Sequence, residues 1–145
     1  MKISFYLKYF FFLIIFFESL IIFSQDKLIA TNLSVDFIIH PDRVLKNGYP
    51  VSVELEEALL ENEKYQIIDI CKKNPLLSWQ ILSKKENTFQ IAYRIIVSSN
   101  KERIDSNIGD LWDSKKIKSD HSINVKYSGK ELNPNTIYYW KVKVW

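Results

Sequence analysis

The chain has 145 residues, of which 47% are hydrophobic and 26% are charged, and its formal net charge is +3. This length suits one domain with a core of its own. A nucleic-acid-binding surface carries a basic stripe or patch, whereas the lysine pairs at 72–73, 84–85 and 115–116 are scattered. Two histidines, one cysteine and three isolated glycines supply neither a convergent set of metal ligands nor a phosphate-binding loop. The sequence therefore predicts no nucleic-acid partner, no metal and no cofactor.

Residues 1–25 predict a secretory signal peptide. Lys2 and Lys8 precede or begin an apolar run that continues to residue 17, and a second apolar piece leads to a small residue before a polar stretch. A charged start, an apolar middle and a small residue at the end are typical of an export signal that is removed. Because Glu18 interrupts the run, an uncleaved membrane anchor is the alternative. We expect an exported protein, in the periplasm or at the cell surface, that meets the membrane only through this segment.

Residues 26–74 are predicted to be a lead-in segment that holds a first strand, a loop and a short helix. The strand covers 31–39, and the loop covers 40–50, where two prolines and an Asn-Gly pair exclude a long regular element. The helix is expected within 53–64, and it either clamps the domain to a neighbour or caps its own sandwich. The apolar positions behind these predictions are Leu33, Val35 and Phe37 on one strand face, and Leu55, Ala58 and Leu59 at helical spacing.

Cys71 is the only cysteine and cannot form an internal disulfide. It follows an apolar stretch that begins at residue 65, so we expect it to be a small buried residue. A domain exported without a disulfide depends on its hydrophobic core for stability.

Residues 75–145 are predicted to form an all-β sandwich. Short apolar stretches alternate with turn residues, and no strand–helix–strand pattern interrupts them. The expected strands cover 76–81, 88–97, 111–117, 121–127 and 138–145. The aromatic residues expected in the core are Trp79, Tyr93, Tyr138 and Trp140.

The last predicted strand begins after a turn at Asn133, Pro134 and Asn135. Tyr138 and every second residue after it lie on one face, which is the pattern of a strand with one buried face. The spacing of residues 132–138 resembles the tyrosine corner of a fibronectin type III sandwich, where a tyrosine hydroxyl bonds to upstream backbone. An ordinary hairpin strand with a core aromatic is the alternative. In either case we expect this strand to lack one neighbour, as in a sandwich truncated before its last strand.

Five motifs in order resemble one family. They are PLLSW at 75–79, AYRIIVSS at 92–99, GDLWDS at 109–114, SDHS at 119–122, and YSGK at 127–130 together with TIYYWKV at 136–142. This series is similar to the amino-terminal fibronectin-III-like (immunoglobulin-like) module of secreted bacterial α-L-rhamnosidases, glycoside hydrolase family 78.

The resemblance implies inverting hydrolysis of α-linked rhamnose by two carboxyl groups. In the family these groups lie in a separate catalytic domain far downstream, and no residue of this chain matches them. We therefore expect a non-catalytic accessory module, inactive alone, at the front of a longer protein or in a truncated reading frame. Its expected partner is the catalytic domain of the same polypeptide, and rhamnose-containing polysaccharide is a second candidate.

The alternative is a free-standing module that binds glycan or protein at the cell surface. Trp112, Tyr139 and Trp145 are the candidate contacts, because flat aromatic faces cover the apolar face of a sugar ring. Packing against a neighbouring strand or domain is the favoured explanation for the same three residues. Asp110 and Asp113 flank Trp112 and suggest a sugar site, although the ends of a turn and of a strand also place carboxylates there.

Overall fold

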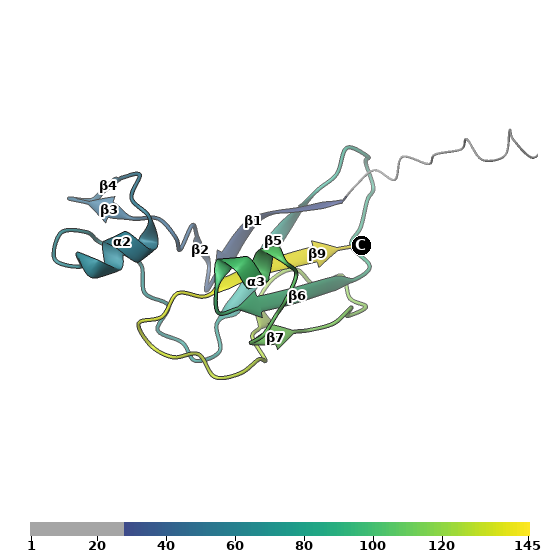
Figure 1. Cartoon of the computed structure of the whole chain (residues 1–145). Coiled ribbons are helices and arrows are strands. Elements are labelled where there is room, and N and C mark those ends of the chain that lie inside the picture. Colours follow the sequence, from purple (N-terminus) through teal and green to yellow (C-terminus); the bar gives the residue numbers. More distant parts are fainter. Residues whose placement is uncertain (1–27) are drawn as a thin grey trace, which may run out of the picture.

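A computed structural model describes residues 28–145, and the predicted signal peptide at residues 1–25 lies outside them. The chain forms two antiparallel sheets packed face to face, with a small insert of a hairpin and a helix to one side (Figure 1). The predicted all-β, immunoglobulin-like sandwich is therefore confirmed. Among residues 28–145, no helix has the length and apolar character that crossing a membrane would require.

The first sheet has the strand order β2-β1-β5-β8, and the second has the order β7-β6-β9. The β6–β9 ladder is the longer part of the second sheet and runs from the pair Tyr93/Val144 to the pair Ser98/Tyr139. Within residues 28–145, β9 pairs with β6 alone, which leaves its other edge unpaired. The first sheet comprises β1 (Ile29–Val35), β2 (Ile38–Ile39), β5 (Leu76–Leu82) and β8 (Val125–Lys126), and the second comprises β6 (Tyr93–Ser98), β7 (Trp112–Asp113) and β9 (Tyr139–Val144).

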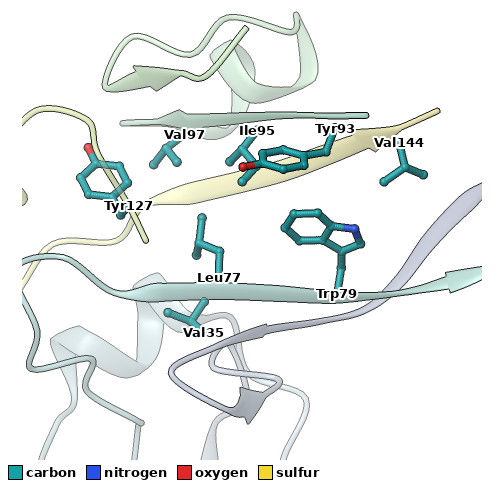
Figure 2. Packing of buried hydrophobic residues seen from close by; sticks show 8 residues of the cluster. All are labelled: Val35, Leu77, Trp79, Tyr93, Ile95, Val97, Tyr127 and Val144. Carbon is teal, nitrogen blue, oxygen red and sulfur yellow. The ribbon is translucent and has the colours of Figure 1, made fainter. Parts of the chain in front are cut away.

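The core lies between the sheets, because alternate residues of β5, β6 and β9 point inward (Figure 2). Trp79 meets Tyr93 edge-on, with ring centroids 5.2 Å apart. Burying a large apolar side chain contributes about 1.5–3 kcal/mol, so this cluster stabilises the sandwich. Its buried members are Val35, Leu77, Trp79, Tyr93, Ile95, Val97, Tyr127 and Val144, and Tyr138, Trp140 and Val142 pack against it partly buried.

The tyrosine at the start of the last strand has the geometry of a tyrosine corner. The hydroxyl of Tyr138 accepts a hydrogen bond of 2.8 Å from the backbone N–H of Asn133. This bond closes the turn that precedes β9 and fixes the direction in which the strand enters the sheet.

The strand predicted over 88–97 is too long at its start. β6 begins only at Tyr93, and Phe89 and Ile91, which an unbroken strand would place on the same face as Tyr93, are 77% and 64% exposed. Gln90, which such a strand would place on the opposite face, is 3% exposed. Its amide is fully hydrogen-bonded inside the domain, which removes the usual cost of burying a polar group.

The first predicted strand is also wrong at its end. β1 stops at Val35, and Asp36 and Phe37 take φ angles of 48° and 70° in the turn to β2. This left-handed backbone ends the alternation, so Phe37 is 69% exposed rather than on the face of Val35. A carboxylate oxygen of Asp36 accepts hydrogen bonds from Leu76 and Lys72, which holds the turn to the start of β5.

The insert contains the predicted short helix, α2 (Leu55–Leu60), beside the hairpin of β3 (Leu45–Lys46) and β4 (Tyr49–Pro50). Its own core is small, with Val44 and Ala58 as the buried residues. Gln66 pairs with Leu45 through two backbone hydrogen bonds of 2.8 and 2.7 Å and closes the insert.

A second helix, α3 (Lys101–Asp105), lies between the strands that the sequence predicts at 88–97 and 111–117. The side chain of Asn100 caps it by accepting a hydrogen bond from the N–H of Arg103. The helix buries Ile104 and packs on β6 and β9. It therefore covers part of the outer face of the second sheet.

Cys71 is exposed, so the prediction of a small buried residue there is wrong. The segment before β5 runs along the surface without joining a sheet. Ile70 takes the inward position and packs against the core, and the neighbouring Cys71 points to solvent as a result.

Candidate functional site

A pocket of about 440 Å³ opens at one side of the sandwich, where the edge strands β7 and β8 face each other. Its lining includes Tyr93 and Trp112 of the second sheet, Val125 and Lys126 of β8, and Ser128. The rest of the lining comes from the segment 117–124, which lies between β7 and β8. We call this segment the strap. The pocket thus joins aromatic residues of the core to a loop that crosses between the sheets.

Backbone hydrogen bonds hold the strap to both sheets. At its start, Ile117 and Tyr93 exchange two N–H to O bonds of 2.8 and 2.9 Å. Further along, the N–H of Trp79 in β5 donates to the carbonyl of Ser122 at 2.9 Å. Because both ends are anchored to strands, this wall of the pocket is in place before any ligand arrives.

Gln90 fixes the middle of the strap from inside the domain. The indole N–H of Trp79 donates to Gln90 Oε1 at 2.8 Å. Gln90 Nε2 in turn donates to the carbonyls of Ser119 and His121, at 3.2 and 2.9 Å. Sequence reasoning missed this residue, because its partners lie about thirty positions away and nothing nearby indicates that they converge.

Trp112 is half-buried and points to the same side of its sheet as its pairing partner Val97. Its ring meets Tyr127 edge-on, with centroids 5.3 Å apart. The hydroxyl of Tyr127 donates to the carbonyl of Lys130 at 2.7 Å, so the ring that supports Trp112 is itself fixed. The tight approach requires a glycine at 129, where a Cβ would lie 2.5 Å from the Trp112 Cβ.

Several polar groups around the pocket have no partner in the part of the chain that the structure describes. The side chains of His121, Asn124 and Lys126 form no hydrogen bond or ion pair within residues 28–145. The hydroxyl of Tyr93 also lacks one, although only 7% of this residue is exposed. No fully buried side-chain polar atom is unsatisfied in the described residues, so the Tyr93 hydroxyl reaches solvent. Burial raises its pKa.

The other two candidate contact aromatics lie elsewhere. Tyr139, at the start of β9, donates a hydrogen bond from its hydroxyl to Glu56 of α2. This bond, with burial, raises the pKa of Tyr139 to about 12. Trp145 follows the end of β9, and the ammonium groups of Lys116 and Lys143 lie 4.4 and 4.8 Å from its ring centroid. Of the three predicted contacts, the structure brings only Trp112 to the pocket.

The two carboxylates beside Trp112 are engaged in contacts within the domain. Asp113 accepts two hydrogen bonds of 2.9 Å from Arg94 and one of 2.7 Å from Lys115. The hydrogen bonds from Arg94 hold the pKa of Asp113 far below its usual range. Asp110 accepts from the backbone and hydroxyl of Ser99, and these bonds lower its pKa as well. Both carboxylates therefore act as anchors for the ends of β6 and β7.

Comparison with known proteins identifies a matching family and similar proteins. The family described as the Rha78A-like, N-terminal immunoglobulin domain matches residues 57–145. An α-L-rhamnosidase of Formosa agariphila is 44% identical over 94 residues, which cover 65% of this chain and 10% of that protein. An α-L-rhamnosidase of Streptomyces avermitilis is 40% identical over 72 residues, which cover 50% of this chain and 7% of that protein. The chain thus spans about a tenth of the length of these curated relatives.

Two solved structures resemble the domain. The α-L-rhamnosidase from Dictyoglumus thermophilum gives a TM-score of 0.51 at 47% identity, over 52% of this chain and 8% of that one. The Streptomyces avermitilis α-L-rhamnosidase complexed with L-rhamnose gives a TM-score of 0.57 at 30% identity, over 81% of this chain and 9% of that one. The resemblance predicted from the five sequence motifs is confirmed, and the chain belongs to the family of Rha78A-like N-terminal immunoglobulin domains.

Proposed function

We propose that this chain is a non-catalytic accessory module of an exported α-L-rhamnosidase-type glycoside hydrolase. It packs against the catalytic domain of the same polypeptide, and the whole enzyme acts on rhamnose-containing glycans. One observation carries the proposal: the matching relatives are α-L-rhamnosidases, and the matched region is at most 10% of their length. Export rests on the signal-like pattern of residues 1–25 alone.

The carboxyl groups with shifted pKa values are engaged in contacts within the domain. Glycoside hydrolysis needs one carboxyl group that stays protonated, which requires a raised pKa. Within residues 28–145, every carboxyl group with a resolved shift has a lowered pKa instead. These groups are Glu56, Asp110, Asp113 and Glu131, each of which accepts a side-chain hydrogen bond from a neighbour.

The surface supports packing against a further domain. Four large apolar side chains are between 69% and 87% exposed. Burying any one of them against a partner would contribute about 1.5–3 kcal/mol before the cost of association. They are Phe37, Tyr49, Leu60 and Phe89.

A domain exchange tests the proposal. Residues 28–145, which hold both sheets, replace the corresponding amino-terminal segment of the Formosa agariphila α-L-rhamnosidase, and hydrolysis of an aryl α-L-rhamnoside is measured for the hybrid and for the present chain alone. We expect the hybrid to be active and the chain alone to be inactive. Turnover by the chain alone contradicts the accessory role. An active hybrid whose first domain is undocked, and is therefore readily cleaved off by limited proteolysis, also contradicts the accessory role.

A pair of variants of the hybrid locates the contact. Leu60→Ser and Phe89→Ser remove exposed apolar groups without touching the core, so we expect the domain to fold normally and to dock less tightly. Lys118→Ser, at an exposed polar position of the strap, serves as the control. If all three variants dock alike, the exposed apolar groups are not the docking surface.

A free-standing binding module is the second candidate function. The pocket beside Trp112 favours it, because a preformed pocket with unpartnered polar groups is what a ligand-binding module needs.

A further inference from the structure

We propose that the pocket beside Trp112 binds one neutral pyranose residue of a glycan. The indole ring covers the apolar side of the sugar, and Tyr93, Asn124 and Lys126 hydrogen-bond its hydroxyl groups. The choice of L-rhamnose as the first sugar to test rests on the proposed function. The site itself rests on the geometry of the pocket.

The hydroxyl of Tyr93 is the first reason. A buried tyrosine normally places its hydroxyl on a protein partner, as Tyr127 and Tyr138 both do in this domain. Only 7% of Tyr93 is exposed, and its hydroxyl, which reaches solvent, bonds to no residue among 28–145. Since Tyr93 lines the pocket, this hydroxyl is a donor and an acceptor offered to whatever enters.

The mixture of surfaces is the second reason. A sugar ring presents C–H groups on one side and hydroxyl groups around its rim. The pocket matches both, because Trp112, Ile117 and Ile123 supply apolar surface while Asn124 and Lys126 supply free hydrogen-bonding groups. Its volume of about 440 Å³ lies within the range of small-molecule sites, which is roughly 300–1,000 Å³.

Rigidity is the third reason. The strap is bonded to β6 at Ile117 and to β5 at Ser122, and Gln90 bonds to the carbonyl of His121. The backbone N–H of Asn124 also donates to the hydroxyl of Ser78 at 2.9 Å. A ligand that enters therefore meets a wall that is already ordered, and it does not lose affinity to the ordering of a loop.

The charge of the pocket gives no strong preference for an acidic sugar. No Asp or Glu lines it, and Lys126 is its only permanent charge. An exposed ammonium contributes little to binding an anion. The neutral groups of Tyr93 and Asn124 both donate and accept, which suits hydroxyl groups.

The test is an NMR titration of the full chain, labelled with ¹⁵N, using L-rhamnose, D-glucose and D-glucuronate as probes. We expect saturable shifts with a neutral sugar at the Trp112 indole N–H and at the amides of Asn124 and Lys126. The expected dissociation constant is on the order of 1 mM. The indole signals of Trp79 and Trp145 serve as internal controls and should not shift.

Two tyrosine variants separate binding from stability. Tyr93→Phe removes a hydroxyl that bonds to nothing in the domain, so we expect unchanged thermal unfolding and about three- to tenfold weaker binding. Tyr138→Phe removes a hydroxyl that bonds inside the domain and lies outside the pocket. For this variant we expect a lower unfolding temperature and unchanged sugar binding. Asn124→Gly is the second pocket variant, because glycine keeps the φ of +56° at this position while losing the amide.

Three outcomes overturn the proposal: no saturable shift at about 100 mM of either neutral sugar, binding of D-glucuronate alone, or neutral-sugar affinity unchanged in both Tyr93→Phe and Asn124→Gly. None of them bears on docking to a catalytic domain, which the domain exchange measures separately. A pocket that binds D-glucose and not L-rhamnose supports the site and counts against its link to rhamnose-containing glycans.

Discussion

The sandwich and the insert are stabilised in different ways. The sandwich buries Trp79, Tyr127 and Ile95 almost completely between two sheets. The insert, between β2 and β5, buries only Val44 and Ala58 to the same degree and leaves Leu60 87% exposed. Its helix α2 is linked to the sandwich by the hydrogen bond from Tyr139 to Glu56. The comparison teaches that the sandwich is held by its own core, whereas the insert depends on contacts at its surface.

The largest effect should come from the centre of the sandwich. Trp79→Ala leaves a large cavity and deprives Gln90 of its indole donor, so we expect a loss of about 3–5 kcal/mol in the free energy of unfolding. Urea denaturation followed by far-UV circular dichroism measures it. Trp145→Ala is the control, with an expected loss below about 1 kcal/mol. Equal losses would mean that the core is not where the stability lies.

Two glycines compare the regions directly. A Cβ at position 129 would lie 2.4 Å from Tyr127 Oη and 2.6 Å from the Leu111 carbonyl, so Gly129→Ala should destabilise the sandwich by about 1–3 kcal/mol. A Cβ at position 48 meets nothing within 4 Å, but φ is +81°. Gly48→Ala should therefore cost about 1 kcal/mol, confined to the insert. Thermal unfolding combined with amide exchange of both regions distinguishes these effects.

The tyrosine corner should contribute a smaller amount. Tyr138→Phe removes the acceptor for the Asn133 N–H, and we expect a loss of about 0.5–1.5 kcal/mol. Chemical denaturation should show a lower midpoint with an unchanged slope. An unchanged midpoint would mean that solvent replaces this hydrogen bond at no cost.

The smallest global effect is expected at the link between the regions. Tyr139→Phe removes the hydrogen bond to Glu56, so amides of the insert should exchange faster while those of β6 and β9 keep their protection. Faster exchange in both regions would contradict the separate stabilisation of the sandwich.

The same link should depend on pH at both extremes. The hydrogen bond from Tyr139 lowers the pKa of Glu56 from its usual value of 4.5. Its stabilisation is therefore present above pH 4.5 and is lost as the pH falls through the lowered value. The pKa of Tyr139 is raised from 10.0 to about 12, so the link is intact below pH 10 and weakens as the pH rises towards 12. Amide exchange of the insert across pH should lose both dependences in Tyr139→Phe.

The sequence predicts the fold best where one face of a strand is buried along its whole length. Alternation is sufficient for β5 and β9, because Leu77, Trp79 and Val144 all face the core. It is insufficient at Gln90, whose burial depends on carbonyl groups of the strap about thirty residues later. It is also insufficient at Phe37, where a left-handed turn interrupts the strand.

The pocket is less predictable than the fold. Trp112 was a candidate contact because it is aromatic and flanked by carboxylates, yet these carboxylates bond to Arg94 and Ser99 rather than to the pocket. Its other members, Tyr93 and Asn124, are brought together by the path of the strap. A tertiary crossing of this kind leaves no local pattern in the sequence.

The strand pairings also bear on how the domain reaches its native state. β1 pairs Ile29 with Leu82, and β6 pairs Tyr93 with Val144, so both principal ladders join residues about fifty positions apart. Closing such long loops costs chain entropy before the stabilising contacts between the strands have formed. Folding of this kind is therefore slow and takes milliseconds to seconds. Neither sheet can be completed early by a local hairpin. Stopped-flow refolding should therefore show far-UV signal and burial of Trp79 developing together, in one late kinetic phase.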